Sequence, residues 1–368
     1  MERVVLFCSD VYTSIGVIRC LGEAGYKPEC FCYGDNCDYL LASCHLGGGK
    51  KFSSINDALT YLLDDYPIYP EKPILLTLPD PPAYYVDLHK TDFEKKFVVM
   101  SAGKSGNIIH WMSKRNIGEL AVKHGLTIPW TIEQKKGDPL PDNLQYPVFT
   151  KNVATIEGGK ADEAICWNKE QLQLKSKEIG SDHFLIMKYI EKKKEINYFG
   201  IAINGRVYID YRDERTRFLP GSYGHYSKFA ICERDSLYNK IVAMIEETGY
   251  EGIFDVEFIQ DADGIMYFLE VNFRVEGTVY RLSPGINLPA EWCRLTKKSK
   301  EELPPKLNIG KSTFTGMSEF QDFRDSVLGG SVNIFLWLYQ FIRADKYALI
   351  NIMDPKPFFY KVFAKFRH

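Results

Sequence analysis

Two short apolar runs in the second half of the chain carry acidic residues at alternate positions. Runs 253–259 and 265–271 alternate with period two, and the Asp-Ala-Asp-Gly stretch between them has turn composition. An antiparallel hairpin of these runs would bring Glu257, Glu270 and Asn272 onto one surface. Their oxygens suit Mg²⁺, which takes a few carboxylates and fills its remaining positions with water and phosphate oxygens. A magnesium site is predicted here, and a hairpin with a solvated acidic face is the alternative.

The second run also predicts which side chains face away from these acids. Strict alternation places Tyr267, Leu269 and Val271 on one face, and it places Met266 and Phe268 on the face of Glu270 and Asn272.

The end of the second run, Glu270-Val271-Asn272-Phe273-Arg274, resembles the metal-binding hairpin of the ATP-grasp superfamily, whose usual ending is close to E-x-N-x-R. The resemblance covers roughly residues 1–300 and depends on several motifs in the right order. It implies ATP and Mg²⁺ as cofactors, with Mn²⁺ able to substitute, and Glu257, Glu270 and Asn272 as metal ligands. It further implies that Arg274 and Lys151 neutralise charge as the γ-phosphoryl group moves.

Two lysines and a glycine pair resemble the family's phosphate-binding positions. Lys114 opens a helix that Ser113 should cap, and Lys151 ends a strand entering a small lid. Gly158 and Gly159 would close over the phosphates, since glycine lets backbone N–H groups approach closely. The acids that flank this glycine pair depart from the family's pattern. Surface positions for the two lysines are the alternative.

The run 184–191 resembles the family's adenine hinge. The residues implied to bind the adenine are Met187, Lys188, Tyr189 and Ile190. Glu195 is the expected ligand of the ribose hydroxyls, and Glu191 is the second choice. A buried strand leading into a solvated lysine-rich turn is the alternative reading of this run.

Arginines beyond the hinge are candidates for holding a substrate carboxylate, because a guanidinium fork matches a carboxylate bidentately. The candidate substrate residues are Arg215, Arg217, His225 and Arg281. A surface cluster in which the arginines neutralise neighbouring acids is an equal alternative.

The first 110 residues alternate between strand-like and helix-like patterns. Strands are predicted at 4–8, 27–32 and 74–78, and helices at 14–25 and 55–66. Such alternation predicts parallel pairing in an open sheet. A nicotinamide-binding unit is the obvious rival, but G-x-G-x-x-G is absent after the first strand.

The fold class implied is α/β and α+β. We expect an ATP-grasp fold with an N-terminal open α/β (pre-ATP-grasp) domain, a small mobile lid and a larger β-rich domain. The predicted boundaries are 1–110 for the N-terminal domain and 111–190 for the linker helix and lid. Residues 191–307 form the catalytic part with the metal hairpin, and 308–368 form a C-terminal extension.

The composition bears on which partners the protein binds and on where in the cell it is found. A net charge of −2 over 368 residues gives no electrostatic reason to propose nucleic acid. Nine cysteines without a signal-like start predict reduced thiols and a cytoplasmic protein. No apolar run is long enough to cross a bilayer. The basic, aromatic stretch 358–368 is expected to dock by its aromatic side, with a peripheral membrane contact as the alternative.

The resemblance implies an ATP-dependent carboxylate–amine ligase that forms an amide or peptide bond through an acyl phosphate. The N-terminal domain, with its turn at 40–43, is most similar to the carbamoyl-phosphate-synthase-like and D-aspartate-ligase-like branch. The implied partners are a small-molecule carboxylate and an amine, such as an amino acid or a cell-envelope precursor, and a homodimer is suggested. A catalytically weak ATP-binding regulatory module and a nicotinamide-dependent enzyme are the alternatives.

Overall fold

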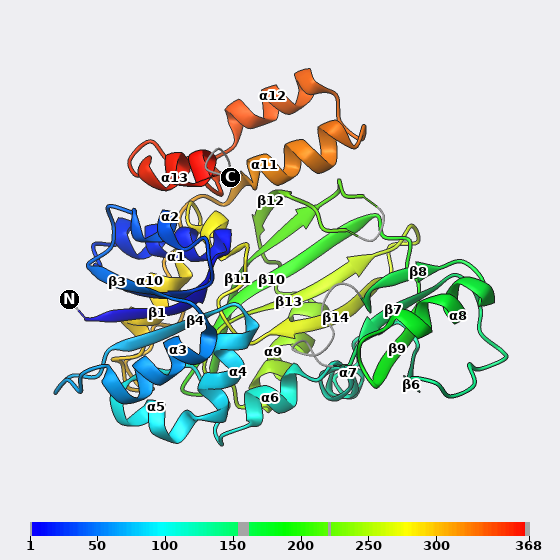
Figure 1. Cartoon of the computed structure of the whole chain (residues 1–368), viewed down its shortest axis with the longest axis horizontal. Helices are drawn as coiled ribbons and strands as arrows, with labels where there is room; N and C mark the ends of the chain where they lie inside the picture. Colours follow the sequence, from blue (N-terminus) through cyan, green and yellow to red (C-terminus); the bar gives the residue numbers. More distant parts are fainter. Residues whose placement is uncertain (1, 154–161, 220–221, 365–368) are drawn as a thin grey trace.

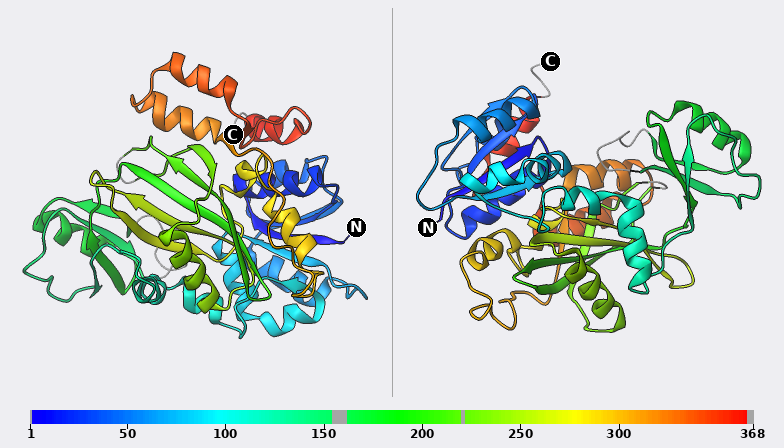
Figure 2. Two further views of the ribbon diagram at one scale, coloured as in Figure 1. Left: turned by 180° about the vertical axis from the view of Figure 1, so that it is seen from behind. Right: turned by 90° about the horizontal axis from the view of Figure 1, so that it is seen from below.

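A computed structural model describes residues 2–153, 162–219 and 222–364. Three β-sheets lie in a row across the molecule, and the last part of the chain lies over the N-terminal and central sheets (Figure 1). Seen from below, the N-terminal sheet and the smallest sheet stand at opposite ends of the central one (Figure 2). This arrangement of α/β and antiparallel parts confirms the predicted fold class.

The N-terminal sheet is parallel and has strand order β3-β2-β1-β4-β5, which confirms the predicted open parallel sheet. Its strands are β1 (Val4–Ser9), β2 (Glu29–Tyr33), β3 (Gly48–Phe52), β4 (Ile74–Leu78) and β5 (Val98–Val99). The helices of this part are α1 (Tyr12–Glu23), α2 (Asp38–Leu41), α3 (Ile55–Thr60), α4 (Asp80–Leu88) and α5 (Lys90–Lys96). A π-helical turn, Tyr61–Asp65, continues α3. β1 and β4 are buried along nearly their whole length because helices cover both faces of the sheet.

The central sheet has seven strands in the order β14-β13-β10-β11-β12-β15-β16. They are β10 (Lys194–Ile203), β11 (Arg206–Arg215), β12 (Tyr226–Ile231), β13 (Gly252–Gln260), β14 (Met266–Asn272), β15 (Thr313–Met317) and β16 (Lys346–Tyr347). Neighbours are antiparallel except for β15 and β16. The helices α9 (Ser236–Thr248) and α10 (Leu288–Leu295) and a 3₁₀ turn, Val279–Leu282, accompany this sheet.

The smallest sheet, with one helix, forms a unit that we call the lid. Its strand order is β6-β9-β7-β8. The elements are β6 (Thr131–Lys135), β7 (Val148–Asn152), β8 (Ala164–Cys166), α8 (Lys169–Glu178) and β9 (His183–Lys188). The lid has its own buried cluster, which includes Val148, Leu172 and Phe184. The helices α6 (Asn107–Met112) and α7 (Lys114–Lys123) lead into it from the N-terminal domain.

The last part of the chain, from 308 onward, adds β15 and β16 to the central sheet and then covers the N-terminal domain (Figure 1). It also contains α11 (Glu319–Asp322), a π-helical turn (Phe323–Leu328), α12 (Ile334–Arg343) and α13 (Lys356–Ala364). Arg19 on α1 anchors it, because the buried Arg19 guanidinium pairs with the buried Asp354 carboxylate at 3.0 Å. No helix in the described part of the chain could span a membrane.

Two expectations about side chains are wrong. Cys32 and Cys37 form a disulfide where reduced thiols were predicted, because the end of β2 and the start of α2 bring their Cα atoms to 6.0 Å. The aromatic side of α13 is only partly docked: Phe358 stacks on Phe320, whereas Phe359 and its neighbour Tyr360 are exposed.

Candidate active site

The predicted hairpin is formed by β13 and β14, and its register confirms the predicted grouping of the acids. Glu257 lies opposite Glu270, and Asp255 lies opposite Asn272. The Asn272 amide donates a hydrogen bond to Glu257 Oε1 at 2.9 Å, so the side chains of these strands meet on one surface.

A β-bulge corrects the predicted alternation on β14. Leu269 is the extra residue, since Phe268 pairs with Phe258 while Glu270 pairs with Glu257. The bulge shifts the alternation by one, so Phe268 pairs with Phe258 and packs in the buried cluster that also contains Phe258 and Val271.

Two lysines approach this surface from different elements. Ser113 caps α7, as predicted, and Lys114 is the first residue of that helix. Lys114 Nζ donates to Asn152 Oδ1 at 3.0 Å, at the end of lid strand β7. Lys151, also on β7, forms an ion pair with Glu270 at 2.8 Å. The lid therefore delivers one cation directly to the hairpin and holds a second one close by.

Arg274 joins the hairpin to the N-terminal domain. Its guanidinium binds the Asp80 carboxylate through two nitrogens, at 2.5 and 2.9 Å. It also donates to Asn272 Oδ1 at 2.9 Å. Asp80 is the first residue of α4, directly after β4 and Pro79. The carboxyl end of the parallel sheet thus sets the position of the arginine beside the metal-ligand candidates.

Burial and mutual repulsion perturb the acids of the hairpin. Burial and the neighbouring carboxylates of Glu270 and Glu276 raise the pKa of Glu257 to about 8. Burial alone would also raise the pKa of Glu270, but Lys151 and Lys114 lower it to about 2. Burial and nearby acids hold the pKa of Asp255 well above its usual range. A bound cation would relieve this repulsion, so the donor set fits a divalent metal.

The candidate ligands are two carboxylates and one amide. In the described part of the chain no group of three or more His, Cys, Asp or Glu side chains converges to hold a metal ion. A hard cation with so few protein ligands keeps water or phosphate oxygens in its other positions, which is the usual behaviour of Mg²⁺. The donor set fits Mg²⁺ bound together with a polyphosphate better than a metal held by protein alone.

A cavity of about 830 Å³ opens between the lid and the central sheet, beside these residues. Lys114, Lys151 and Glu257 line one part of it. Apolar side chains line another part, among them Ile128, Phe149, Leu185 and Phe268. A volume of this size, with one charged part and one apolar part, suits a ligand that combines a flat ring with a polyphosphate.

Comparisons with known proteins agree with this geometry. Residues 181–312 match the family model described as "ATP-grasp in the biosynthetic pathway with Ter operon". The fold is similar to an L-amino acid ligase from Bacillus licheniformis, with TM-score 0.63, 13% identity, and coverage of 83% of this chain and 78% of that one. It is also similar to an N5-carboxyaminoimidazole synthetase from Staphylococcus aureus, with TM-score 0.66, 16% identity, and coverage of 88% and 83%.

A third similar structure is a biotin carboxylase from Campylobacter jejuni, with TM-score 0.63, 15% identity, and coverage of 84% of this chain and 74% of that one. No curated protein sequence matches this chain. The matched segment contains the whole β13–β14 hairpin, and the fold likeness extends over most of the chain. Residues 181–312 thus match an ATP-grasp family model, and most of the chain has the fold of these structures.

The hinge predicted for the ATP-grasp nucleotide site lines the cavity. All four of its residues, Met187, Lys188, Tyr189 and Ile190, belong to the cavity wall. Lys188 Nζ donates to the Tyr267 hydroxyl at 3.3 Å, across from the lid to β14. Gly158 and Gly159 lie outside the described residues.

The two candidate ribose ligands, Glu195 and Glu191, differ in burial and in whether they line the cavity. Glu195 is buried, and its carboxylate accepts from Lys192 Nζ at 2.5 Å and from the Gly224 backbone N–H at 2.9 Å. Glu191 lies in the cavity wall, which Glu195 does not reach. Glu191 is therefore better placed than Glu195 for a ligand in this cavity.

The candidate substrate residues lie beyond the hairpin, and acids accompany most of them. Arg215 pairs with Asp213 at 3.1 Å and with Glu195 at 3.5 Å. Arg217 binds the Asp322 carboxylate bidentately. These contacts match the alternative that the sequence left open, in which arginines neutralise acids.

His225 and Arg281 lie together on the same side. His225 Nε2 is 2.9 Å from Asp325 Oδ2, and burial together with Arg281 lowers the pKa of His225. Arg281 donates to the His225 carbonyl at 3.1 Å and to Thr278 Oγ1 at 3.0 Å. Its Nε is buried and has no hydrogen-bond partner among the described residues, so one donor stays available.

Sequence reasoning missed two residues of this site. Asp255 shares the face of Glu257, and its carboxylate accepts from Asn197 at 3.2 Å and Asn272 at 3.4 Å. Its place in the alternation was a signal that could have included it. Asp80 gave no signal, because its partner Arg274 lies 194 residues away in the sequence.

Proposed function

We propose that this protein is an ATP-dependent carboxylate–amine ligase that works through an acyl phosphate. The observation that carries the proposal is the meeting of Lys114, Lys151 and the acidic hairpin at one part of a cavity with an apolar wall. Such a site can hold a nucleotide and neutralise the charge of its phosphates. The ligases among the similar folds support the same reaction class.

ATP is proposed to bind with its adenine between the hinge and the apolar wall. Backbone groups of Met187 and Ile190 would read the edge of the ring, and Lys188 supplies positive charge nearby. We assign the ribose hydroxyls to Glu191, because its side chain lines the cavity and is exposed, whereas Glu195 is buried and bound by Lys192 and Gly224. Gly158 and Gly159 stay proposed contacts of the phosphates.

Glu257, Glu270 and Asn272 are proposed to hold Mg²⁺, with Mn²⁺ able to replace it. The metal would supply charge neutralisation on the phosphate oxygens. Lys151 and Arg274 are the proposed catalytic cations. Lys151 is held at Glu270 and Arg274 at Asp80, so both are oriented before the substrate arrives. Preorganised cations stabilise developing charge without reorganising during the reaction.

The proposed reaction has two steps. A substrate carboxylate oxygen attacks the γ-phosphorus of ATP, the bond to the β-phosphate oxygen breaks, and ADP leaves. The amine nitrogen then attacks the acyl carbon, inorganic phosphate departs, and the nitrogen loses a proton. The lid over the cavity would keep water from hydrolysing the acyl phosphate. No protein nucleophile takes part.

The carboxylate substrate is proposed to lie on the side of Arg281 and His225. Arg281 keeps a buried donor without a partner in the described structure, which suits a carboxylate oxygen. Arg215 would support this side by fixing the acids around it, and Arg217 is the weakest candidate because Asp322 occupies its fork. An amino acid or an amine-bearing cell-envelope precursor is the proposed substrate class, in the cytoplasm where ATP is supplied.

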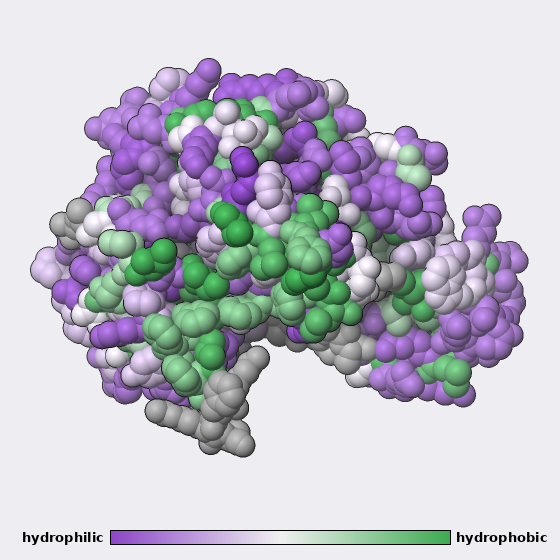
Figure 3. All heavy atoms as spheres, turned by 90° about the horizontal axis from the view of Figure 1, so that it is seen from above, coloured by the Kyte–Doolittle hydropathy of each residue, from purple (hydrophilic) through white to green (hydrophobic). Residues whose placement is uncertain are grey.

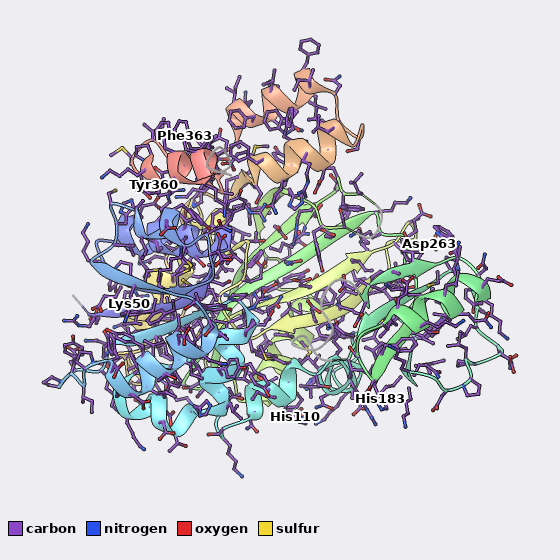
Figure 4. All side chains as sticks on the ribbon, in the orientation of Figure 1. Lys50, His110, His183, Asp263, Tyr360 and Phe363 are labelled. Atoms are coloured by element: carbon purple, nitrogen blue, oxygen red, sulfur yellow. A yellow bond between two sulfur atoms is a disulfide. The ribbon has the colours of Figure 1, made fainter. Side chains whose placement is uncertain are left out.

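The test is Mg²⁺-dependent release of ADP and phosphate from ATP, measured against pools of amino acids. Glu270→Gln removes one metal-ligand charge, and Asp263→Asn at the turn of the same hairpin is the matched control (Figure 4). We expect at least one pool to stimulate turnover in the wild type and the control, and Glu270→Gln to lose it.

A direct measurement of ATP binding distinguishes the ligase from the weak ATP-binding module and from a protein that does not bind ATP. ATP binding without turnover in any pool would favour the catalytically weak ATP-binding module, which the crowding of acids at the hairpin makes a real second candidate. Absence of ATP binding by titration calorimetry would overturn both proposals.

A further inference from the structure

Helix α12 turns its apolar side outward. Phe335, Leu338, Tyr339 and Ile342 follow helical spacing, so they share one face, and all four are exposed. Phe335 is 79% exposed and Ile342 is 77% exposed. Trp337 is the buried residue of this helix. A surface helix of a globular protein normally has the opposite arrangement, with its apolar stripe on the core.

The same side of the molecule continues over the next two segments. Ile352 and Met353, in the turn before α13, are 90% and 81% exposed. Phe359, Tyr360 and Phe363 on α13 are about half exposed, and Figure 4 shows the last two at the outer edge of the molecule. Seen from above, these segments form a green apolar band (Figure 3). We call the exposed side chains of α12, 352–353 and α13 the outer face.

Positive charge accumulates in this part of the chain. Residues 308–368 contain eight Lys and Arg against five Asp and Glu, a net charge of +3, whereas the whole chain has −2. Each of the five acids accepts a hydrogen bond inside the protein; they are Glu319, Asp322, Asp325, Asp345 and Asp354. Two of the cations, Lys346 and Lys361, form ion pairs with Glu23 and Asp10 outside this segment. Arg343 and Lys356, next to the apolar side chains, are exposed and form no ion pair within the described residues.

We propose that the outer face docks on an anionic lipid surface. Aromatic and aliphatic side chains flanked by cations are the composition that binds the interface of such a membrane. A second copy of the chain is the weaker occupant, because it would bring two positively charged faces together. A helix of ten residues is too short to span a bilayer, so α12 would lie in the plane of the interface.

Docking in this way leaves the nucleotide cavity free. None of the residues lining that cavity belongs to 308–368. The proposal is therefore independent of the proposed ligase reaction, and each can fail without the other.

The test is co-sedimentation of the full chain with two kinds of vesicle. One is phosphatidylcholine alone, and the other contains equal amounts of phosphatidylcholine and phosphatidylglycerol. We expect binding to the second kind and at least about tenfold weaker binding to the first. Phe335→Ser with Ile342→Ser should reduce anionic-vesicle binding by at least about tenfold, because the apolar anchors are lost.

Control variants test whether vesicle binding depends on the outer face in particular. Ile68→Ser with Leu174→Ser removes two exposed aliphatic side chains elsewhere on the surface and should leave vesicle binding unchanged. Arg343→Glu with Lys356→Glu should weaken binding by about fivefold or more for each position. Circular dichroism of every variant verifies the fold.

Two results would overturn the proposal. One is equal sedimentation with both kinds of vesicle or with neither. The other is a concentration-dependent dimer, seen by light scattering, that Phe335→Ser with Ile342→Ser dissociates; this would assign the outer face to a second copy.

Discussion

The β13–β14 hairpin, proposed to hold the metal, and the neighbouring arginine cluster of Arg215 and Arg217 both carry buried charges. These charges are balanced in different ways. On the hairpin, Asp255, Glu257 and Glu270 repel one another, and burial together with Glu270 and Glu276 raises the pKa of Glu257 to about 8. In the arginine cluster, Arg215 and Arg217 each have an acid partner within the protein. We propose that a bound ligand completes the charge balance of the first region, whereas ion pairs within the protein balance the charges of the second.

On this proposal, the difference distinguishes residues that bind a ligand from residues that stabilise the fold. A buried charge without compensation costs stability, so it persists where a ligand supplies the missing charge. A buried charge with a bidentate partner contributes to the fold and offers little to a substrate. Glu276 connects the regions, since its charge raises the pKa of Glu257 on the hairpin and of Asp213 beside Arg215.

The largest effect is expected for Glu257→Gln. Removing this carboxylate should lower ATP turnover by about 10³-fold, because the metal loses a charged ligand. The same change should leave the unfolding temperature in the absence of metal unchanged or higher, because repulsion from Glu270 and Glu276 disappears. Activity assays and thermal unfolding, each with and without Mg²⁺, provide the measurement.

If Glu257→Gln lowered both ATP turnover and the unfolding temperature without metal, repulsion among the hairpin acids would not be the reason that they bind a cation. Mg²⁺ with ADP should also raise the unfolding temperature of the wild type and not that of Glu257→Gln. Asp263→Asn, at the turn of the same hairpin, should behave as the wild type in both assays.

The second effect concerns the arginine cluster. Arg217→Ala should destabilise the protein by about 3 kcal/mol, because it leaves the buried Asp322 carboxylate without its bidentate partner. Asp322→Asn should cost a similar amount, and the double variant should cost clearly less than the two together. Denaturant unfolding of all three variants measures this coupling.

The opposite pattern would make Arg217 a substrate residue. In that case Arg217→Ala would raise the KM for the carboxylate substrate and leave the unfolding free energy unchanged.

The hairpin could be predicted from the sequence because it depends on a pattern within a short stretch of residues. Period two and a turn place Glu257, Glu270 and Asn272 on one face within 16 residues, and the structure confirms that grouping. The bulge at Leu269 escaped prediction because the alternation of apolar residues gave no sign of an extra one. Here packing of Phe268 on Phe258 overrides strict periodicity.

Contacts over long sequence separations could not be read in the same way. The partners of Arg217 and His225 lie in the C-terminal extension, 105 and 100 residues away. An arginine bound to a distant aspartate and an arginine free for a substrate have the same sequence. For the same reason the outer face of α12 was unpredictable, since helical spacing shows a stripe but not the direction that it faces.

The third effect tests the contact between the N-terminal domain and the hairpin. Asp80→Asn should lower kcat by about tenfold and leave the KM for ATP nearly unchanged, because Arg274 loses the carboxylate that orients it. Asp80 is a positioning residue, so Asp80→Glu should recover part of the rate. A drop in unfolding temperature with unchanged kcat would instead make the ion pair purely structural.

The smallest effect is a pH dependence of nucleotide affinity that arises at Lys114. Burial and the charge of Lys151 lower the pKa of Lys114 to about 8, so this lysine loses its proton just above neutral pH. Phosphate binding favours the protonated form, and the affinity for ATP should therefore weaken by about fourfold between about pH 7 and about pH 8.5. Titration calorimetry in buffers of matched ionic strength measures this change. Lys114→Arg keeps its charge over this range, so its affinity should stay level, and an equally steep loss in that variant would assign the pH dependence to another group.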